Sequence, residues 1–395
     1  MRNKIIFFFK QHGIFLNMFW KLFRIFLQLW SFFVPVKDKT MLFASFGGRK
    51  FDDSPRALYE TICREKEFND WELIWVFVNP DDYDIPRGRK VKIDSKEFFH
   101  ALLYSRVWVS NSGIDRGLHL KRKNLLKVET WHGTPLKKIL GDENENSLGG
   151  KRKNNGKVDS TTIRCAQSEY DKKLFERLFN ASPDCILLSD LPRNDSLVGY
   201  DEELNLKIRG KLGIGIDKTI ILYTPTYREY LVDDNNQTYI KPPMDLQKWK
   251  RTLGDNYVIL IRAHYAVAAA LSIVEDEFVK DVSSYPSLND LYIISDMMIS
   301  DYSSTFFDYS ILDRPMFCFA YDLEEYQRRR GLYLDLEITL PCPVDKDEHS
   351  LLDHIRYCNY EKAVEETKSF HKRFAPYAGN ASTTVISEMK RRLQL

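Results

Sequence analysis

The segment WHGTP (131–135) carries the first side chain of this sequence that is suited to acid–base chemistry. His132 follows an apolar run, LLKVETW (125–131), that is typical of a buried strand. Parallel sheets bind ligands at the carboxyl ends of their strands, and Gly133 would let the backbone approach such a ligand closely. A single histidine is more often structural, but this placement favours His132 as a general base.

A second histidine, His264, ends the run YVILIRAH (257–264), which also contains Arg262. This run predicts another buried strand, so His264 would occupy the equivalent strand end in the second half of the chain. Two histidines at equivalent strand ends would face one cleft. One would lie near an attacking hydroxyl and the other near a phosphate.

Hydroxyl side chains gather where the predicted strand MMIS (297–300) turns into the helical pattern FFDYSIL (306–312). Asp301 or Ser303 can cap this helix. A cap alone would be commonplace, but the free N–H groups of the first turn and the neighbouring hydroxyls also predict an anion site. The hydroxyls are those of Ser303, Ser304 and Thr305.

The run TIILYTPTYR (219–228) predicts a strand and a turn that carry Thr226 and Arg228. The guanidinium of an arginine is suited to binding phosphate. Phosphoryl transfer needs in-line positioning, neutralisation of oxygen charge and a base for the incoming hydroxyl, with little covalent help from the protein. Histidine, arginine and an anion site together meet these requirements.

The elements that would position these side chains alternate along a chain of 395 residues, which is longer than one hydrophobic core usually organises. The apolar runs of the first half lie at 41–46, 72–78, 106–110 and 125–131. A second alternating series begins near residue 218, and such alternation predicts α/β units with parallel sheets. Two Rossmann-like halves joined near 190–215 describe a GT-B-like fold with a cleft between them. We therefore expect domains at 37–205 and 206–395.

The apolar N-terminal stretch (5–34) is interrupted by charged residues, so no charge-free window of about 18 residues exists for a membrane-spanning helix. At helical spacing, its large apolar side chains form one stripe. The opposite face carries Asn17, Lys21, Arg24 and Gln28. Residues 1–36 are therefore predicted to form an amphipathic segment that lies on a membrane surface. The alternative is a helix packed on the protein's own core.

The charge balance is nearly even, with 58 Lys and Arg against 56 Asp and Glu, and gives no overall argument for a nucleic-acid partner. Local basic runs are usually solvated faces, and the alternative for them is contact with anionic lipid or a polyanionic acceptor. The six cysteines show no CxxC and no zinc-type spacing, which favours reduced thiols in the cytosol. No DxD-like pair or ligand cluster indicates a metal, and the sequence leaves a requirement for Mg²⁺ open.

Five motifs follow one another along the chain: WHGTPLKK, LPRND (191–195), YTPTYR, RAH and SDYSSTFFDYSILDRP. In order and spacing they resemble the CDP-glycerol glycerophosphotransferase family, which comprises teichoic-acid primases and polymerases and related capsule polymerases. The resemblance runs from about residue 40 to about residue 380.

This resemblance implies a GT-B fold and peripheral attachment at the cytoplasmic side of the cell membrane. It also implies transfer of glycerol phosphate or ribitol phosphate from CDP-glycerol or CDP-ribitol, with release of CMP. The acceptor would be a hydroxyl of a lipid-linked glycan or polyol-phosphate chain. Domain 37–205 would be the acceptor side and domain 206–395 the CDP-donor side.

Carried over to this sequence, the resemblance implies that His132 is the base and that His264 acts on the phosphate side. Ser303 and Ser304 would bind the donor pyrophosphate. The expected donor side further includes Thr226, Arg228, Arg262, Thr305 and Asp308, the last in the FFD stretch. Leu191 stands where the family pattern has a tyrosine, so the roles of Arg193 and Asn194 stay open, as do those of Gly133 and Asp301.

Two other functions fit the same features. A GT-B glycosyltransferase that uses a nucleotide sugar would need the same fold and the same anion site, because fold alone does not decide function. A non-catalytic protein that binds an envelope glycan would need only the amphipathic helix and the basic runs. The histidines at strand ends disfavour it, since binding alone requires no titratable groups there.

Overall fold

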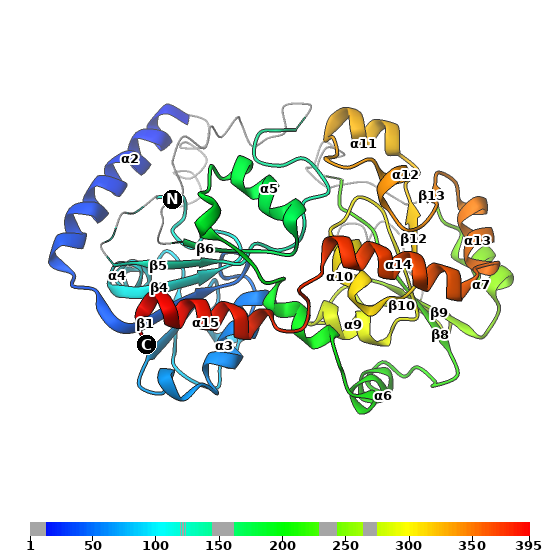
Figure 1. The fold of residues 1–395 in the computed structure, drawn as a ribbon, viewed down its shortest axis with the longest axis horizontal. Helices are drawn as coiled ribbons and strands as arrows, with labels where there is room; N and C mark the ends of the chain where they lie inside the picture. Colours follow the sequence, from blue (N-terminus) through cyan, green and yellow to red (C-terminus); the bar gives the residue numbers. More distant parts are fainter. Residues whose placement is uncertain are drawn as a thin grey trace, which may run out of the picture. The chain divides into compact units, whose positions relative to one another are not determined.

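The computed structural model describes residues 13–118, 120, 122, 124–143, 162–228, 243–263 and 275–395. These residues form two compact units, and in each of them helices pack around a sheet (Figure 1). The first unit comprises the described residues up to His132 together with 162–165 and 382–395. The second comprises 133–143 and the described residues from 166 to 381.

The first sheet consists of β1 (Lys37–Ala44), β2 (Glu72–Phe77), β3 (Arg89–Lys92), β4 (Ser105–Ser110), β5 (Leu126–Glu129), β6 (Thr162–Ala166) and β7 (Ile186–Leu188). The spatial order is β3-β2-β1-β4-β5-β6-β7, and the pairings from β3 to β6 are parallel. Met41 lies opposite Leu73 on one side and Val107 on the other, and all three are fully buried. Continuous apolar strands are typical of parallel sheets that are covered on both faces.

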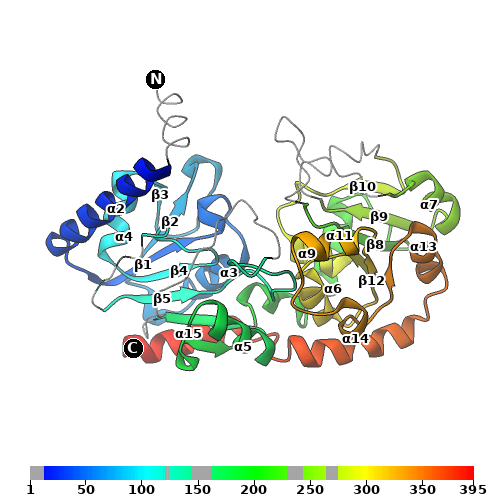
Figure 2. The same ribbon diagram turned by 90° about the horizontal axis from the view of Figure 1, so that it is seen from above.

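The helices of the first unit are α2 (Gly13–Trp30), α3 (Asp53–Ile62), α4 (Lys96–Tyr104) and most of α15 (Ala381–Leu393). The last of these returns from the end of the chain. Lys390 of α15 forms ion pairs of 2.7 Å with Glu65 and 2.9 Å with Glu67, and Arg392 donates to the main-chain oxygen of Thr162. The C-terminal helix is therefore part of the N-terminal α/β unit, as Figure 2 also shows.

The second sheet consists of β8 (Thr219–Thr224), β9 (Tyr257–Ile261), β10 (Val279–Asp281), β11 (Met297–Ser300), β12 (Met316–Phe319) and β13 (Val344–Asp345). Its order is β10-β9-β8-β11-β12-β13, and all pairings are parallel. The helices of this unit are α5 (Glu169–Leu178), α6 (Glu202–Lys211), α7 (Leu246–Leu253), α9 (Leu288–Ile294), α10 (Thr305–Tyr309), α11 (Leu323–Arg329), α12 (Leu336–Thr339), α13 (Glu348–Arg356) and α14 (Tyr360–Phe374).

This parallel α/β organisation confirms the fold class expected from the alternating sequence pattern. The segment predicted at 297–300 is β11. The boundaries at 37–205 and 206–395 stay a prediction.

Helix α2 packs one side on the first unit and exposes another. Leu27 is fully buried in the core of this unit, and the Phe23 ring contacts the Phe99 ring of α4 at 5.0 Å. On the exposed side, Leu22, Phe26 and Leu29 keep 59%, 56% and 57% of their surface accessible. No helix among the described residues has the length and apolar character needed to cross a membrane.

Candidate active site

His132 lies in the loop that follows β5, at the carboxyl edge of the first sheet. Its Nδ1 is 3.0 Å from the main-chain oxygen of Asn111, the residue that follows β4. Because a carbonyl oxygen only accepts hydrogen bonds, Nδ1 carries the proton of the neutral ring and Nε2 keeps its lone pair. The imidazole is therefore held in a tautomer that suits a general base acting through Nε2.

Neighbouring side chains fix both this ring and the carbonyl that holds it. The Trp131 ring stacks on the His132 ring with centroids 4.3 Å apart. Asn111 is fully buried, and its side-chain oxygen accepts a hydrogen bond of 2.8 Å from the main-chain N–H of Phe46. His132 itself is exposed. The arrangement thus combines a fixed orientation with access from solvent.

Gly133 lets the WHGTP loop lie closer to Ser304 than a residue with a side chain would allow. A Cβ atom at Gly133 would lie 2.5 Å from Oγ of Ser304, and φ at this position is +135°. Both the contact and the backbone conformation exclude a side chain here. The same point lies 3.6 Å from Nη2 of Arg193. A glycine backbone, a hydroxyl and a guanidinium therefore converge within the second unit.

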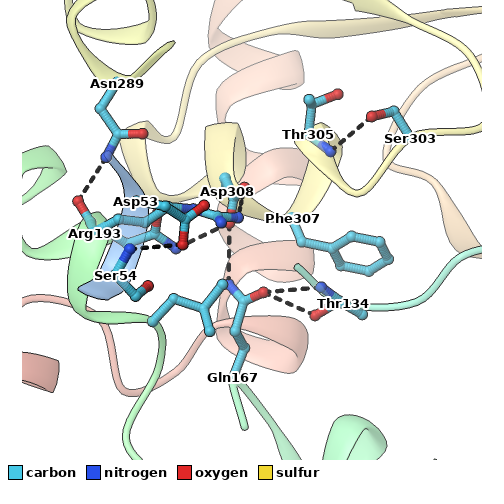
Figure 3. Close-up of polar contacts among 12 residues, drawn as sticks. Asp53, Ser54, Thr134, Gln167, Arg193, Asn289, Ser303, Thr305, Phe307 and Asp308 are labelled. Carbon is cyan, nitrogen blue, oxygen red and sulfur yellow. Dashed lines mark hydrogen bonds and ion pairs between the residues drawn. The ribbon is translucent and has the colours of Figure 1, made fainter. Parts of the chain in front are cut away.

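Residues 301–304, called the hydroxyl segment below because they include Ser303 and Ser304, connect β11 with α10. Oγ of Ser303 accepts a hydrogen bond of 3.2 Å from the N–H of Thr305 (Figure 3). The hydroxyl of Thr305 lies 3.0 Å from that of Ser300 and 3.4 Å from that of Thr224, which ties the start of α10 to the ends of β11 and β8. Ser303 and Ser304 are both partly accessible. The segment therefore presents hydroxyls at the carboxyl edge of the second sheet.

The expected helix at 306–312 is shorter than predicted. Helix α10 has five residues and is followed by a 3-10 turn, Ser310–Leu312. The anion site expected at the start of this helix stays a prediction. Of the two residues expected to cap this helix, Ser303 accepts a bond from the N–H of Thr305, the first residue of α10, whereas Asp301 does not cap it. Its carboxylate accepts hydrogen bonds of 2.7 Å from the N–H of Tyr302 and 2.9 Å from that of Thr226.

Arg228 is fully buried, although the sequence suggested it as a ligand of pyrophosphate. Nε and Nη2 each donate to Asp322 at 2.8 Å, and Nη1 donates to Asp301 at 2.9 Å. The guanidinium also lies over the rings of Tyr302 and Tyr326, at 4.7 and 5.2 Å from their centroids. Burial lowers the pKa of Arg228, but the two carboxylates outweigh it and raise this pKa above its ordinary value. Arg228 therefore joins the loops after β8, β11 and β12, and its burial does not support direct contact with a donor.

The second histidine segment is described only in part. Arg262 follows β9, and its Nη1 donates to the main-chain oxygens of Val282, at 2.9 Å, and Tyr285. This guanidinium thus holds the chain that follows β10. His264 lies outside the described residues, so its predicted role stays a prediction.

A buried polar network connects three of the sequence motifs within the second unit (Figure 3). Gln167, the residue after β6, accepts hydrogen bonds from the N–H and the hydroxyl of Thr134 at 3.1 and 3.0 Å. Its amide nitrogen donates to Asp190 at 3.1 Å and to Asp308 at 3.3 Å. Asn194, in the 3-10 helix Pro192–Leu197, donates to the same two carboxylates at 3.1 and 2.9 Å.

The network also fixes a charged pair and two further carboxyl groups. Nη2 of Arg193 lies 2.7 Å from Oδ2 of Asp308. Asp171 on α5 accepts a hydrogen bond of 2.9 Å from the hydroxyl of Thr134. Burial raises the pKa of Asp171 and of Asp190 to about 7 in each case. These two groups thus keep their protons to a much higher pH than exposed aspartates do.

Sequence reasoning missed Gln167, Asp171, Asp190 and Asn111. Each lies at or just beyond the carboxyl end of a strand or in the helix that follows, but only Asn111 follows a strand that the sequence pattern predicted. A polar residue directly after an apolar run was the available signal. Over the described ranges, no group of three or more His, Cys, Asp and Glu side chains is arranged to hold a metal ion.

Comparisons with known proteins identify the family of this chain. Residues 26–389 match the CDP-glycerol:poly(glycerophosphate) glycerophosphotransferase family. A teichoic acid poly(glycerol phosphate) polymerase of Staphylococcus epidermidis is 34% identical over 90% of this chain, which spans about half (50%) of that protein. A teichoic acid glycerol-phosphate transferase of Staphylococcus aureus is 33% identical over 84% of this chain and 87% of its own length.

The fold comparison agrees with the sequence comparison. The solved structure of the wall teichoic acid polymerase TagF superposes with a TM-score of 0.85 at 31% identity, covering 100% of this chain and 98% of that one. The two parallel α/β units are therefore those of a GT-B-like fold. The segments WHGTP, LPRND and SDYSSTFFDYS, whose residues meet in the network above, all lie inside the matched range. The chain belongs to the CDP-glycerol:poly(glycerophosphate) glycerophosphotransferase family.

Proposed function

We propose that this protein transfers glycerol phosphate from CDP-glycerol to a hydroxyl of a teichoic-acid-type acceptor and releases CMP. The observation that carries the proposal is the approach of Gly133 to Ser304 and Arg193. Adjacent Cα atoms are about 3.8 Å apart, so the peptide bond alone keeps His132 next to this point. A base, hydroxyl donors and a cation are the groups that phosphoryl transfer requires.

In the proposed reaction, Nε2 of His132 accepts the proton of the acceptor hydroxyl while the hydroxyl oxygen forms a bond to the phosphorus of the glycerol phosphate group. The bond between this phosphorus and the oxygen shared with CMP breaks, and CMP leaves with that oxygen. Arg193 and the hydroxyls of Ser303 and Ser304 stabilise the charge on the phosphoryl oxygens. His264 would act on the side of the leaving phosphate.

The names of the two relatives described above support glycerol over ribitol as the polyol. The Staphylococcus epidermidis relative is a poly(glycerol phosphate) polymerase, and the Staphylococcus aureus relative is a glycerol-phosphate transferase. Both names also point to a teichoic acid as the acceptor. We propose a lipid-linked form of this acceptor at the membrane surface. A capsule-type acceptor is the alternative that a product analysis would reveal.

We further propose that α2 attaches the protein to the cytoplasmic face of the cell membrane. Its exposed side carries Leu22, Phe26 and Leu29, which would enter the boundary between headgroups and acyl chains. Lys21 and Arg24 are exposed on the same helix and suit anionic headgroups. The buried Leu27 would hold the helix to its own domain.

The domain roles complete the proposal. Domain 37–205 contains His132 and would bind the acceptor, and domain 206–395 contains the hydroxyl segment and would bind CDP-glycerol. Arg228 and Arg262 would support the donor domain from within, because both guanidinium groups bond to the protein itself.

Purified protein incubated with a lipid-linked acceptor analogue and CDP-glycerol, CDP-ribitol or a UDP-sugar tests the function. We expect release of CMP and lengthening of the acceptor with CDP-glycerol. Turnover of only the UDP-sugar would support the nucleotide-sugar alternative and refute the proposal. Binding of the acceptor without turnover of any donor would support a non-catalytic role. A parallel series with EDTA decides whether Mg²⁺ is required.

A further inference from the structure

The carboxamide of Gln167 has one defined orientation. The side chain is fully buried, and its oxygen faces the main-chain N–H of Thr134, which can only donate. The amide nitrogen must therefore face the other way, toward Oδ1 of Asp190 and Oδ1 of Asp308. Gln167 is thus the group that joins the WHGTP loop to this pair of carboxyl groups. An ionised aspartate or glutamate could not replace it without losing the two donated bonds.

The position of Asp308 decides where Arg193 points. Oδ1 of Asp308 accepts from Gln167 at 3.3 Å and from Asn194 at 2.9 Å, while Oδ2 binds Nη2 of Arg193 at 2.7 Å. The Asp308 side chain is 3% exposed and that of Arg193 is 14% exposed. Asn289 additionally donates to the main-chain oxygen of Arg193 at 2.6 Å (Figure 3). Both the main chain and the guanidinium of Arg193 are therefore held in place.

We propose that Gln167 is a positioning residue that sets the guanidinium of Arg193 against the transferred phosphoryl group. The inference rests on the proposed function. Nη2 of Arg193 lies beside Gly133, where Oγ of Ser304 also approaches. In this proposal the phosphoryl oxygens lie at this point, beside both groups. A rotation of the Asp308 carboxylate would displace the guanidinium from this point, and Gln167 and Asn194 are the amides that prevent it.

The Gln167→Glu variant distinguishes positioning from simple support of the fold. Glutamate has the same shape and still accepts from Thr134, but when ionised it places an oxygen against two carboxyl groups. When it gains a proton it donates again and restores one of the lost bonds. The charged or titratable groups around this position are Asp171, Asp190, Arg193 and Asp308. Gln167→Met removes the donors at every pH and has no proton to gain.

The experiment measures CMP release and thermal stability from pH 5.5 to 8.5 for the wild type and the variants. We expect kcat of Gln167→Met to fall about 10- to 100-fold at every pH, as for lost hydrogen bonds to charged groups, with little change in the KM for CDP-glycerol. We expect Gln167→Glu to show a similar loss at high pH that becomes smaller as the pH falls. Gln247→Glu on the exposed face of α7 adds the same charge away from the site and should match the wild type.

The outcomes separate this inference from the proposed function. If the wild type releases CMP and Gln167→Glu shows no recovery of kcat relative to Gln167→Met at low pH, the positioning role is wrong. A loss of thermal stability without a loss of kcat would also overturn it. If the wild type itself releases no CMP from CDP-glycerol, the proposed function is wrong. Should Gln167→Met fail to fold, the pH series of Gln167→Glu decides, because its protonated form keeps the shape of glutamine.

Discussion

Replacing Gly133 by alanine would place a methyl group 2.5 Å from Oγ and 2.7 Å from Cβ of Ser304. Real Cβ atoms do not approach other heavy atoms so closely, so either the WHGTP loop or the hydroxyl segment would have to move. The backbone adds strain, because φ is +135° and costs an L-residue about 1–3 kcal/mol. Overpacking costs about 1–3 kcal/mol more. We expect Gly133→Ala to lower the free energy of unfolding by about 2–6 kcal/mol, the sum of these terms.

The same displacement should affect catalysis more than folding. A misplacement of about 1 Å can lower turnover about 100-fold, so we expect at least this loss in CMP release from CDP-glycerol. Gly141→Ala is the matched control, since its φ is +100° but no atom lies within 4 Å of the added Cβ. It carries the backbone strain without the contact. Adding Ser304→Gly to Gly133→Ala removes both clashing atoms and should restore stability beyond the sum of the single effects. Equal activity and stability of Gly133→Ala and Gly141→Ala would refute this reasoning.

Four further outcomes are expected. His132→Ala should lower turnover about 100-fold or more, as expected for the loss of a general base, and calorimetry should show unchanged affinity for CDP-glycerol. Near-normal turnover of a folded variant would contradict the assignment of His132 as the base. Arg228→Ala should cost about 3–5 kcal/mol in chemical denaturation because it removes the cation from the buried Asp301 and the largely buried Asp322. A loss confined to donor affinity would show instead that Arg228 binds the donor. Burial raises the pKa of Asp190 to about 7, so the folded protein keeps a proton on this carboxyl group that the unfolded chain releases near pH 4. The contribution of this proton to the free energy of unfolding is therefore present at low pH and is lost as the pH rises to 7. In urea titrations across this range, Asp190→Asn should make the fall of stability less steep by about 1.4 kcal/mol per pH unit, and an unchanged slope would argue against the buried proton. Replacing the exposed Leu22, Phe26 and Leu29 of α2 by serine should release the protein from anionic vesicles while activity on a soluble acceptor is retained. Unchanged flotation with the vesicles would show that this surface does not bind the membrane.

The sequence predicted the two parallel α/β sheets because their central strands are long apolar runs. Strands β2 and β11 lie at or close to the predicted positions, since Leu73–Phe77 and Met297–Ser300 are buried on both faces. Strands β3, β6, β7, β10 and β13 were missed. They have two to five residues each and lie at or near the sheet edges, where charged residues such as those in RKVK (89–92) conceal any periodicity. Their existence depends on pairing with a neighbouring strand, which a local pattern does not contain.

The sequence also selected most of the residues that meet at the candidate site. Gly133 and Ser304 follow predicted strands, and Arg193 and Asp308 were selected through the family resemblance. Gly133, Arg193, Ser304 and Asp308 come together in the second unit although up to 175 positions separate them. What each side chain does was decided only by tertiary packing. Arg228 has the charge of a phosphate ligand, but it is fully buried between carboxylates that stand 73 and 94 positions away in the chain. Gln167 has no feature of a catalytic residue, yet the fold places its amide against Asp308, 141 positions later. Residue type limits the chemistry that a side chain can perform, whereas burial and hydrogen-bond partners are set by contacts between distant segments and choose among these possibilities.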